Sequence, residues 1–229
     1  MSLQGRLLSA PIAHRGLWRV GGRPENSLTA FEAACAGGYG IELDVRLTAD
    51  GEAVVFHDET LERMTAQSGL VEEQTAETLA ALTLLGSDQH IPTLEQTLAL
   101  VGQRALLLVE LKTPAGQEGL LEAGAAALLA VHPGPVGVLS FNPDALAWMA
   151  AHAPDLARGL NAGQPSDLEA IDRAHPDFLS VGLDLADHPR VRDWRAAGRP
   201  VIAWTAHRPA DAARLHDLAD NLIFEGFQP

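Results

Sequence analysis

Residues 105–112 read Ala-Leu-Leu-Leu-Val-Glu-Leu-Lys, an apolar run that ends on an acid and a base. Helical stretches rich in Ala and Leu lie on both sides of this run, at Thr93–Val101 and Gly119–Ala130. Strands that alternate with helices in this way predict a parallel sheet whose strands are joined by crossover helices. The run therefore belongs to an α/β fold.

The same strand–helix unit recurs along the chain. We expect eight strands, at Pro11–Ala13, Ile41–Val45, Ala105–Leu111, Val136–Leu139, Ala157–Leu160, Phe178–Val181, Val201–Trp204 and Leu222–Phe224. We expect helices at Ser27–Ala36, Thr93–Val101, Gly119–Ala130, Pro143–Ala153, Ser166–Ala174, Pro189–Ala197 and Ala210–Leu218. Eight such units predict a (β/α)8 TIM barrel, a fold of typically ~250 residues. An open doubly wound sheet is the alternative.

One segment breaks this rhythm. A further strand is expected at Ala53–Phe56, after the turn pair Asp50-Gly51, and a mostly polar stretch with scattered leucines follows from Asp58 to His90. This stretch is too short to build a hydrophobic core of its own, so we interpret it as a small insertion at one end of the barrel, after the second strand. Residues 1–229 are thus expected to form a single barrel domain with an insertion at about 58–90.

The composition excludes several classes of protein. Hydrophobic residues make up 47% of the chain and charged residues 20%, which is typical of a globular protein. The formal net charge of −14 disfavours nucleic acid as a partner, and an anionic substrate would need a local cation from Arg, Lys or a metal. Cys35 is the single cysteine, so neither an intrachain disulfide nor a cysteine-built zinc site is expected. No apolar run approaches the ~18 residues of a membrane span and no leader pattern opens the chain, so we expect a cytoplasmic protein.

Two carboxylates share one face of the strand expected at Ile41–Val45. Side chains alternate between the two faces of a strand, so Glu42 and Asp44 point the same way. Two inward carboxylates repel each other and lose hydration, and they are tolerated when a cation lies between them or when one takes a proton. Hard divalent cations prefer such oxygen ligands. The alternative is a pair of solvated acids at an exposed strand end.

A second pair, Glu110 and Lys112, shares one face at the end of the apolar run. The carboxyl ends of barrel strands carry the active site in this fold. Lys112 is the only lysine in the chain, and its compact ammonium group suits a phosphate oxygen or a metal-bound carboxylate. The alternative is a plain ion pair between the two side chains.

Two of the nine histidines end apolar strands, where their side chains would face the mouth of a barrel. His14 follows the first strand and is itself followed by Arg15, whereas His57 follows Ala53–Phe56. A histidine can give or take a proton near neutral pH, and two histidines can do both. A lone histidine at a strand end is more often structural. Two of them, together with three acids and an Arg/Lys pair at strand ends, predict an acid/base site.

Taken in order, these pieces resemble the glycerophosphodiester phosphodiesterase family. The matching motifs are His14-Arg15-Gly16, Pro24-Glu25-Asn26-Ser27, Glu42-Leu43-Asp44, Asp50-Gly51, Val54-Val55-Phe56-His57-Asp58, Leu61-Glu62-Arg63-Met64-Thr65, Ile91-Pro92-Thr93-Leu94-Glu95, Glu110-Leu111-Lys112, Ser140-Phe141 and Trp204-Thr205. The resemblance implies a (β/α)8 barrel with a small insertion. It also implies hydrolysis of glycerophosphodiesters to glycerol 3-phosphate and an alcohol, with Ca²⁺ or Mg²⁺ as cofactor.

The resemblance also implies a role for individual side chains. The implied metal ligands are Glu42, Asp44 and Glu110. The implied acid/base pair is His14 and His57. The residues implied to hold the phosphate are Arg15 and Lys112, and Trp204 would line the glycerol side.

The chain departs from the family's usual pattern in three places. Ser27 stands where the family usually has Thr, His207 where it often has Asn, and Phe224-Glu225 where it often has a Thr-Asp pair. Ser27 keeps the ability to cap a helix. The late departures leave the implied metal ligands and histidines untouched, so they bear on substrate preference more than on reaction type.

Two other functions are compatible with these residues. One is a related phosphodiesterase that acts on lysophospholipids or on cyclic or inositol-type diesters, although the polar insertion offers no acyl-binding patch. The other is a non-catalytic barrel that binds glycerophosphate, which would be expected to have lost a histidine or a carboxylate. The residues leave open the head-group alcohol, the preferred metal, the order in which the histidines act, the nucleophile (water or an adjacent substrate hydroxyl) and the oligomeric state.

Overall fold

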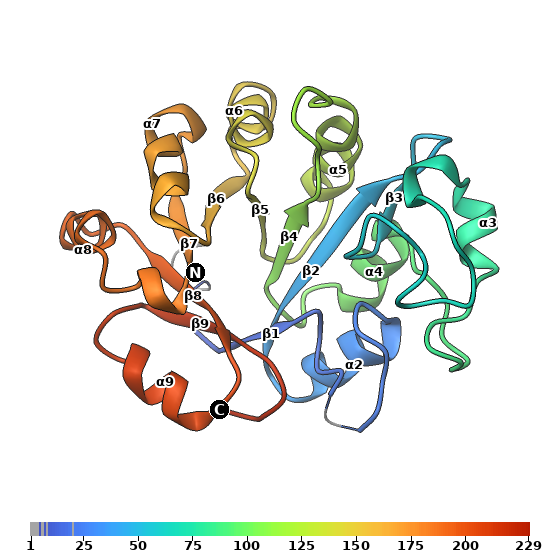
Figure 1. The fold of residues 1–229 in the computed structure, drawn as a ribbon, viewed down its shortest axis with the longest axis horizontal. Coiled ribbons are helices and arrows are strands. Elements are labelled where there is room, and N and C mark those ends of the chain that lie inside the picture. Colours follow the sequence, from blue (N-terminus) through green and yellow to red (C-terminus); the bar gives the residue numbers. More distant parts are fainter. Residues whose placement is uncertain (1–4, 6, 8, 20) are drawn as a thin grey trace.

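Eight parallel strands close into a barrel in the computed structural model, which describes residues 5, 7, 9–19 and 21–229 (Figure 1). In order around the barrel they are β1 (Ile12–His14), β2 (Gly40–Leu47), β4 (Leu107–Leu111), β5 (Val136–Ser140), β6 (Ala157–Ala162), β7 (Phe178–Gly182), β8 (Val201–Ala206) and β9 (Asn221–Phe224). The barrel closes because β1 pairs with both β2 and β9. The predicted (β/α)8 barrel is therefore confirmed, and the open sheet is excluded.

Helices connect successive strands and surround the barrel (Figure 1). They are α2 (Leu28–Ala36), α4 (Leu94–Val101), α5 (Leu120–Ala130), α6 (Pro143–His152), α7 (Ile171–Ala174), α8 (Pro189–Ala196) and α9 (Pro209–Leu215). A short 3₁₀ helix at Leu183–Leu185 also follows β7. In the described part of the chain, no helix has the length and apolar character that crossing a membrane requires.

Local side-chain chemistry sets where these helices begin. Ser27 precedes α2 and accepts a hydrogen bond from the backbone N–H of Ala30, as its position before an apolar helix indicates. The prediction of a helix at Ser166–Ala174 is wrong in its first part. That part is a 3₁₀ helix at Pro165–Ala170, which runs into α7. The Asp167 carboxylate accepts from the backbone N–H groups of residues 163 and 164, so side-chain bonds hold the start of this turn.

The interior of the barrel is apolar toward the amino ends of the strands and polar at their carboxyl ends, where the barrel has its mouth. The apolar part is a cluster separate from the core between strands and helices, and it consists of Leu7, Ile12, Leu106, Leu108, Leu139, Phe178, Ile202 and Ile223. Residues two positions apart on a strand point to the same face, so the next inward side chain lies one layer nearer the carboxyl end. His14 follows Ile12 in this way, and Glu110 follows Leu108. The apolar layer thus forms the floor on which the polar groups lie.

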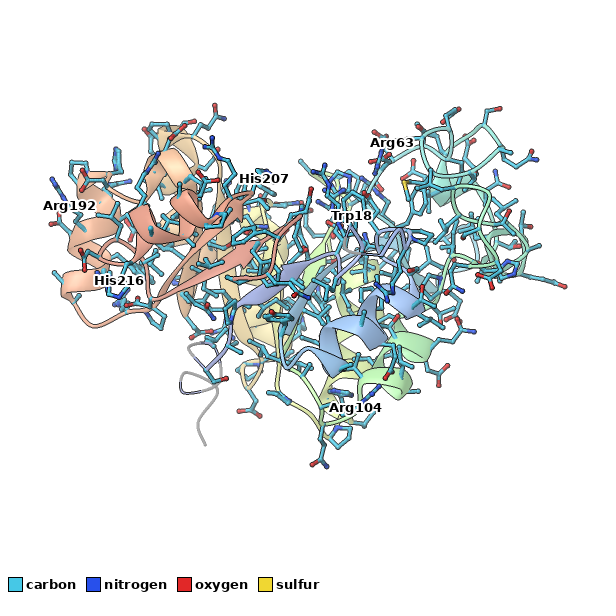
Figure 2. The ribbon with its side chains drawn as sticks, turned by 90° about the horizontal axis from the view of Figure 1, so that it is seen from below. Trp18, Arg63, Arg104, Arg192, His207 and His216 are labelled. Carbon is cyan, nitrogen blue, oxygen red and sulfur yellow. The ribbon has the colours of Figure 1, made fainter. Side chains whose placement is uncertain are left out.

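The insertion lies beyond β3 (Ala53–Val55), which pairs antiparallel with β2. It contains a 3₁₀ turn (Val71–Glu73) and α3 (Ala76–Ala80), and in Figure 2 it projects from the barrel on the side where Arg63 is labelled. Its buried side chains, together with buried residues at its two flanks, form a distinct apolar cluster, made of Val54, Phe56, Leu61, Met64, Val71, Leu79, Leu84 and Ile91. The segment from Asp58 to His90 does not complete this cluster alone, because Val54, Phe56 and Ile91 come from its two flanks.

Candidate active site

A cavity of about 280 Å³ opens at the carboxyl ends of the barrel strands. All eight site residues expected from the sequence line it, namely His14, Arg15, Glu42, Asp44, His57, Glu110, Lys112 and Trp204. A second cavity, of about 310 Å³, lies beside it between Lys112, the end of β2 and the insertion residues Glu59, Glu72 and Glu73. The structure thus brings the whole expected set to one place, although the residues span most of the chain.

Three buried carboxylates meet at one wall of the cavity. Glu42 and Asp44 come from β2, and Glu110 lies directly beside Asp44 on β4. One oxygen from each of the three carboxylates lies within 4.8 Å of the others. Burial, together with repulsion from Asp44 and Glu110, raises the pKa of Glu42 well above its ordinary value. Burial likewise raises the pKa of Glu110. Three hard oxygen donors whose repulsion a cation would relieve fit a divalent metal ion.

Two cations flank these carboxylates. The Lys112 ammonium lies 2.9 Å from Asp44 Oδ1 and 2.5 Å from Glu110 Oε1. The Arg15 guanidinium lies 3.4 Å from Asp44 Oδ2, through Nε. Burial alone would raise the pKa of Asp44, but Lys112 and Arg15 outweigh it and hold this pKa well below the usual range. These pairings favour the ionised form of Asp44, and they raise the pKa values of Arg15 and Lys112 against the opposing effect of burial.

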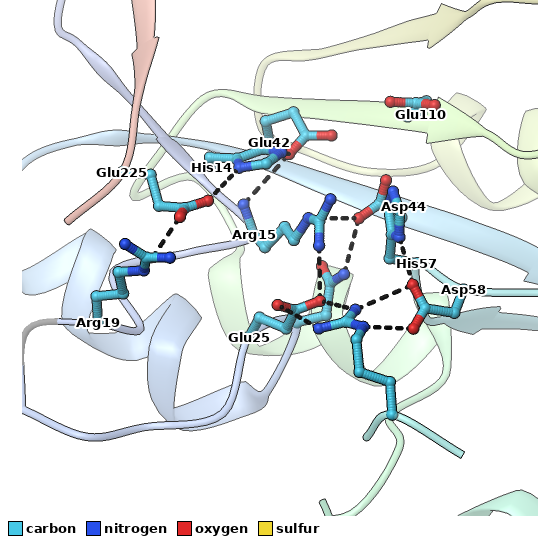
Figure 3. Close-up of polar contacts among 12 residues, drawn as sticks. His14, Arg15, Arg19, Glu25, Glu42, Asp44, His57, Asp58, Glu110 and Glu225 are labelled. Carbon is cyan, nitrogen blue, oxygen red and sulfur yellow. Dashed lines mark hydrogen bonds and ion pairs between the residues drawn. The ribbon is translucent and has the colours of Figure 1, made fainter. Parts of the chain in front are cut away.

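The His14 imidazole is held from behind by a carboxylate (Figure 3). Its Nδ1 lies 2.7 Å from Glu225 Oε2, and its Nε2 lies 3.8 Å from Glu42 Oε2. Glu225 is in turn paired with Arg19, 3.1 Å away. A carboxylate at Nδ1 favours the proton on that nitrogen, which leaves Nε2 to exchange a proton in the cavity.

His57 is held in the same way. Its Nδ1 lies 2.7 Å from Asp58 Oδ1, and Asp58 accepts two hydrogen bonds from Arg63, at 2.5 and 3.0 Å (Figure 3). Burial lowers the pKa of His57 below its ordinary value, which favours the neutral imidazole. Both histidines therefore present Nε2 to one cavity, each with a carboxylate behind its Nδ1.

A further network positions Arg15. Glu25 accepts hydrogen bonds from Arg15, at 2.7 Å, and from Arg63 of the insertion, at 2.6 Å. Asn26 donates to Asp44 Oδ2 at 2.8 Å. Arg15 and Asn26 have φ angles of 57° and 54°, a left-handed backbone that non-glycine residues adopt rarely and that is enriched at functional sites. The loop between β1 and α2 is thus shaped around the carboxylates.

Six residues of these networks, of which Arg19 is one, were assigned no role from the sequence. Glu25, Asn26 and Arg63 lie inside motifs that carried the family resemblance, and Asp58 is adjacent to His57, so a local signal existed for these four. Glu225 stands where the family often has the Asp of a Thr-Asp pair, and its contact with His14, 211 residues away along the chain, corrects the expectation that this late departure leaves the histidines untouched.

The side of the cavity formed by β5 to β8 is neutral. Its lining side chains include Leu139, Phe141, Asn161 and Trp204. The Phe141 and Trp204 rings pack edge to face with centroids 5.7 Å apart. The structure therefore places Trp204 across the cavity from the carboxylates.

Comparisons with known proteins agree with one another. The sequence model described as "Glycerophosphoryl diester phosphodiesterase family" matches residues 14–224. A glycerophosphodiester phosphodiesterase of Caldanaerobacter subterraneus is 32% identical over 224 residues, which cover 89% of this chain and 88% of the relative. The structure of a phosphodiesterase of Oleispira antarctica, in complex with the product sn-glycerol-3-phosphate, superposes with a TM-score of 0.87 at 30% identity, and covers 98% of this chain and 95% of that chain.

Proposed function

Because this enzyme belongs to the glycerophosphoryl diester phosphodiesterase family, we propose that it hydrolyses glycerophosphodiesters to glycerol 3-phosphate and an alcohol, with a divalent cation. The observation that carries the proposal is the set of three buried carboxylates, two cations and two histidines on one cavity. The product named for the Oleispira relative supports the choice of substrate.

Glu42, Asp44 and Glu110 would hold the cation, Ca²⁺ or Mg²⁺, because their oxygens converge and their negative charge exceeds what Lys112 and Arg15 offset. When bound, such an ion polarises a phosphate oxygen and offsets the charge of the diester.

Arg15 and Lys112 hold the phosphate in this proposal. Each cation is anchored to Asp44, so its charge is fixed at the cavity before the anion arrives. A guanidinium group can form two parallel hydrogen bonds to phosphate oxygens, and an ammonium group supplies a compact positive charge. Together they attract a phosphodiester into the mouth of a chain whose net charge is −14.

His14 and His57 move the protons. Hydrolysis of a phosphodiester needs one group to deprotonate the nucleophile and another to protonate the leaving alkoxide. The two Nε2 atoms suit this division because Glu225 and Asp58 occupy both Nδ1 atoms. The pair serves equally well when water attacks and when an adjacent substrate hydroxyl attacks first.

A lysophospholipid is disfavoured as substrate. A long acyl chain would require a continuous apolar patch at the mouth of the barrel. The exposed large apolar residues of the described chain are Leu85, Leu120, Val131 and Phe141, and of these only Phe141 lines the cavity.

The test is release of glycerol 3-phosphate from glycerophosphocholine and glycerophosphoethanolamine. We expect release to stop with EDTA, to return with Ca²⁺ or Mg²⁺, and to be absent in Glu42→Ala at every metal concentration. Folded protein that releases no glycerol 3-phosphate with either metal would overturn the proposal.

A further inference from the structure

Two buried polar atoms on the neutral side of the cavity have no hydrogen-bond partner. They are Asn161 Oδ1, from β6, and Trp204 Nε1, from β8. Both residues line the cavity, and Asn161 is only 3% exposed. Burying a polar atom without a partner costs roughly 1–3 kcal/mol, so such atoms are rare in folded proteins and call for an explanation.

The chemistry of these two atoms is complementary to a hydroxyl group. The Asn161 amide oxygen accepts a hydrogen bond, and the Trp204 indole N–H donates one. A hydroxyl group does both, so it can pair with either atom. It would also pair with Asn161 if the amide were turned to present its NH₂ group. An ionised group has no counter-charge here, because Leu139, Phe141, Asn161 and Trp204 are all neutral.

We propose that Asn161 binds a free hydroxyl of the substrate's glycerol group and thereby determines the preference for a polyol on this side of the phosphate. The inference rests on the proposed function, in which Arg15 and Lys112 fix the phosphate at the opposite wall. The glycerol then extends toward β6 and β8, where the edge-to-face rings of Phe141 and Trp204 confine it. A hydroxyl that fills this place supplies the partner that the buried amide lacks.

Ser180 provides a matched control. It lies beside Asn161 in the β6–β7 ladder and its hydroxyl is likewise buried without a partner, but it does not line the cavity. A Ser180→Ala change therefore alters the same part of the barrel without touching the proposed ligand.

The experiment compares the binding of glycerol 3-phosphate and of n-propyl phosphate, which lacks both hydroxyls, by calorimetry in the presence of Mg²⁺. We expect the wild type to prefer glycerol 3-phosphate by about tenfold or more, as one well-placed hydrogen bond implies. Asn161→Ala should weaken the binding of glycerol 3-phosphate by about tenfold and change the affinity for n-propyl phosphate by less than about twofold. Ser180→Ala should leave both affinities at wild-type values. Because binding is measured without turnover, the result does not depend on the rate of the reaction.

Three results would overturn the inference while leaving the proposed function intact. The first is an Asn161→Ala protein that keeps the wild-type preference. The second is equal weakening of the binding of both ligands by Asn161→Ala. The third is a Ser180→Ala protein that loses the preference to the same extent. The second and third results would each indicate general damage to the barrel. Asn161→Ser, which retains a polar group but shortens its reach, repeats the measurement should the alanine variant fail to fold. A wild type that neither binds nor releases glycerol 3-phosphate would instead overturn the proposed function.

Discussion

The two sides of the barrel mouth differ in how their polar groups are paired. On the side of β1, β2 and β4, acids and bases are paired with one another, as in the chain of contacts that joins Glu25, Arg15, Asp44 and Lys112. On the side of β5 to β8 the lining is neutral, and Asn161 has a buried oxygen with no partner. In the proposed function the charged side binds the phosphate of the diester, whatever its alcohol, and the neutral side binds the glycerol. Substitutions on the first side should therefore change turnover, and substitutions on the second should change preference.

The largest effect should come from the buried carboxylates. Glu42→Gln should lower turnover by at least ~10³-fold, because metal assistance contributes several kcal/mol to such reactions. The same change should raise the melting temperature of the protein in EDTA, since burial and repulsion already raise the pKa of Glu42 in the folded state. Turnover assays and thermal denaturation with and without Ca²⁺ measure both effects. A variant that is less stable than the wild type in EDTA would contradict the repulsion argument.

Loss of either histidine should have the next largest effect on turnover. His14→Ala and His57→Ala should each reduce turnover by roughly 10²–10⁴-fold, the range of general acid–base catalysis. Circular dichroism should show the fold unchanged, and calorimetry should show metal affinity close to that of the wild type. Near-normal turnover in one of these variants would remove that histidine from the mechanism.

The carboxylates behind the histidines should have smaller effects, with a characteristic pH dependence. Asp58→Asn should reduce turnover by roughly tenfold to a hundredfold, because the imidazole loses a charged hydrogen-bond partner. Burial lowers the pKa of His57, and Asp58 partly offsets this effect, so removing its charge should lower the pKa further. The limb of the kcat/KM profile that reports His57 should then move to lower pH.

The pH profile should move to lower pH whether His57 acts as the base or as the acid. A base is lost as the pH falls through its pKa and an acid is lost as the pH rises through it, so both limbs follow the pKa downward. Glu225→Gln is the matched change behind His14 and should leave the limb that reports His57 in place. An unshifted profile in Asp58→Asn would show that Asp58 does not act on His57.

The smallest effect should come from the contact between the barrel and the insertion. Arg63 pairs with Glu25 and Asp58, but its side chain is 47% exposed, so solvent screens these ion pairs. Arg63→Ala should lower the free energy of unfolding by less than about 1 kcal/mol in urea titrations. It should lower turnover a few-fold, since Glu25 and Asp58 both lose a shared cation. Arg104→Ala, which removes an exposed pair with Glu32 on α2, should leave turnover unchanged.

The barrel and the charged side could be predicted from the sequence because their signals are local. Each parallel strand is a short apolar run between helices, and Glu42 and Asp44 reveal their common face through their spacing alone. The remaining features depend on contacts between distant segments. Glu225 reaches His14 only when β9 closes the barrel against β1. The core of the insertion needs residues from both flanks, and Asn161 becomes informative only when its lack of a partner is known.

The most direct test of the contrast between the two sides is a crystal structure of the protein with Ca²⁺ and glycerol 3-phosphate. We expect the ion to bind one oxygen from each of Glu42, Asp44 and Glu110, with the phosphate between the ion and Arg15. The glycerol should point toward Asn161 and Trp204, with a hydroxyl within hydrogen-bond distance of the Asn161 amide. An ion bound away from the three carboxylates, or a glycerol directed into the cavity between Lys112 and the insertion, would contradict the account.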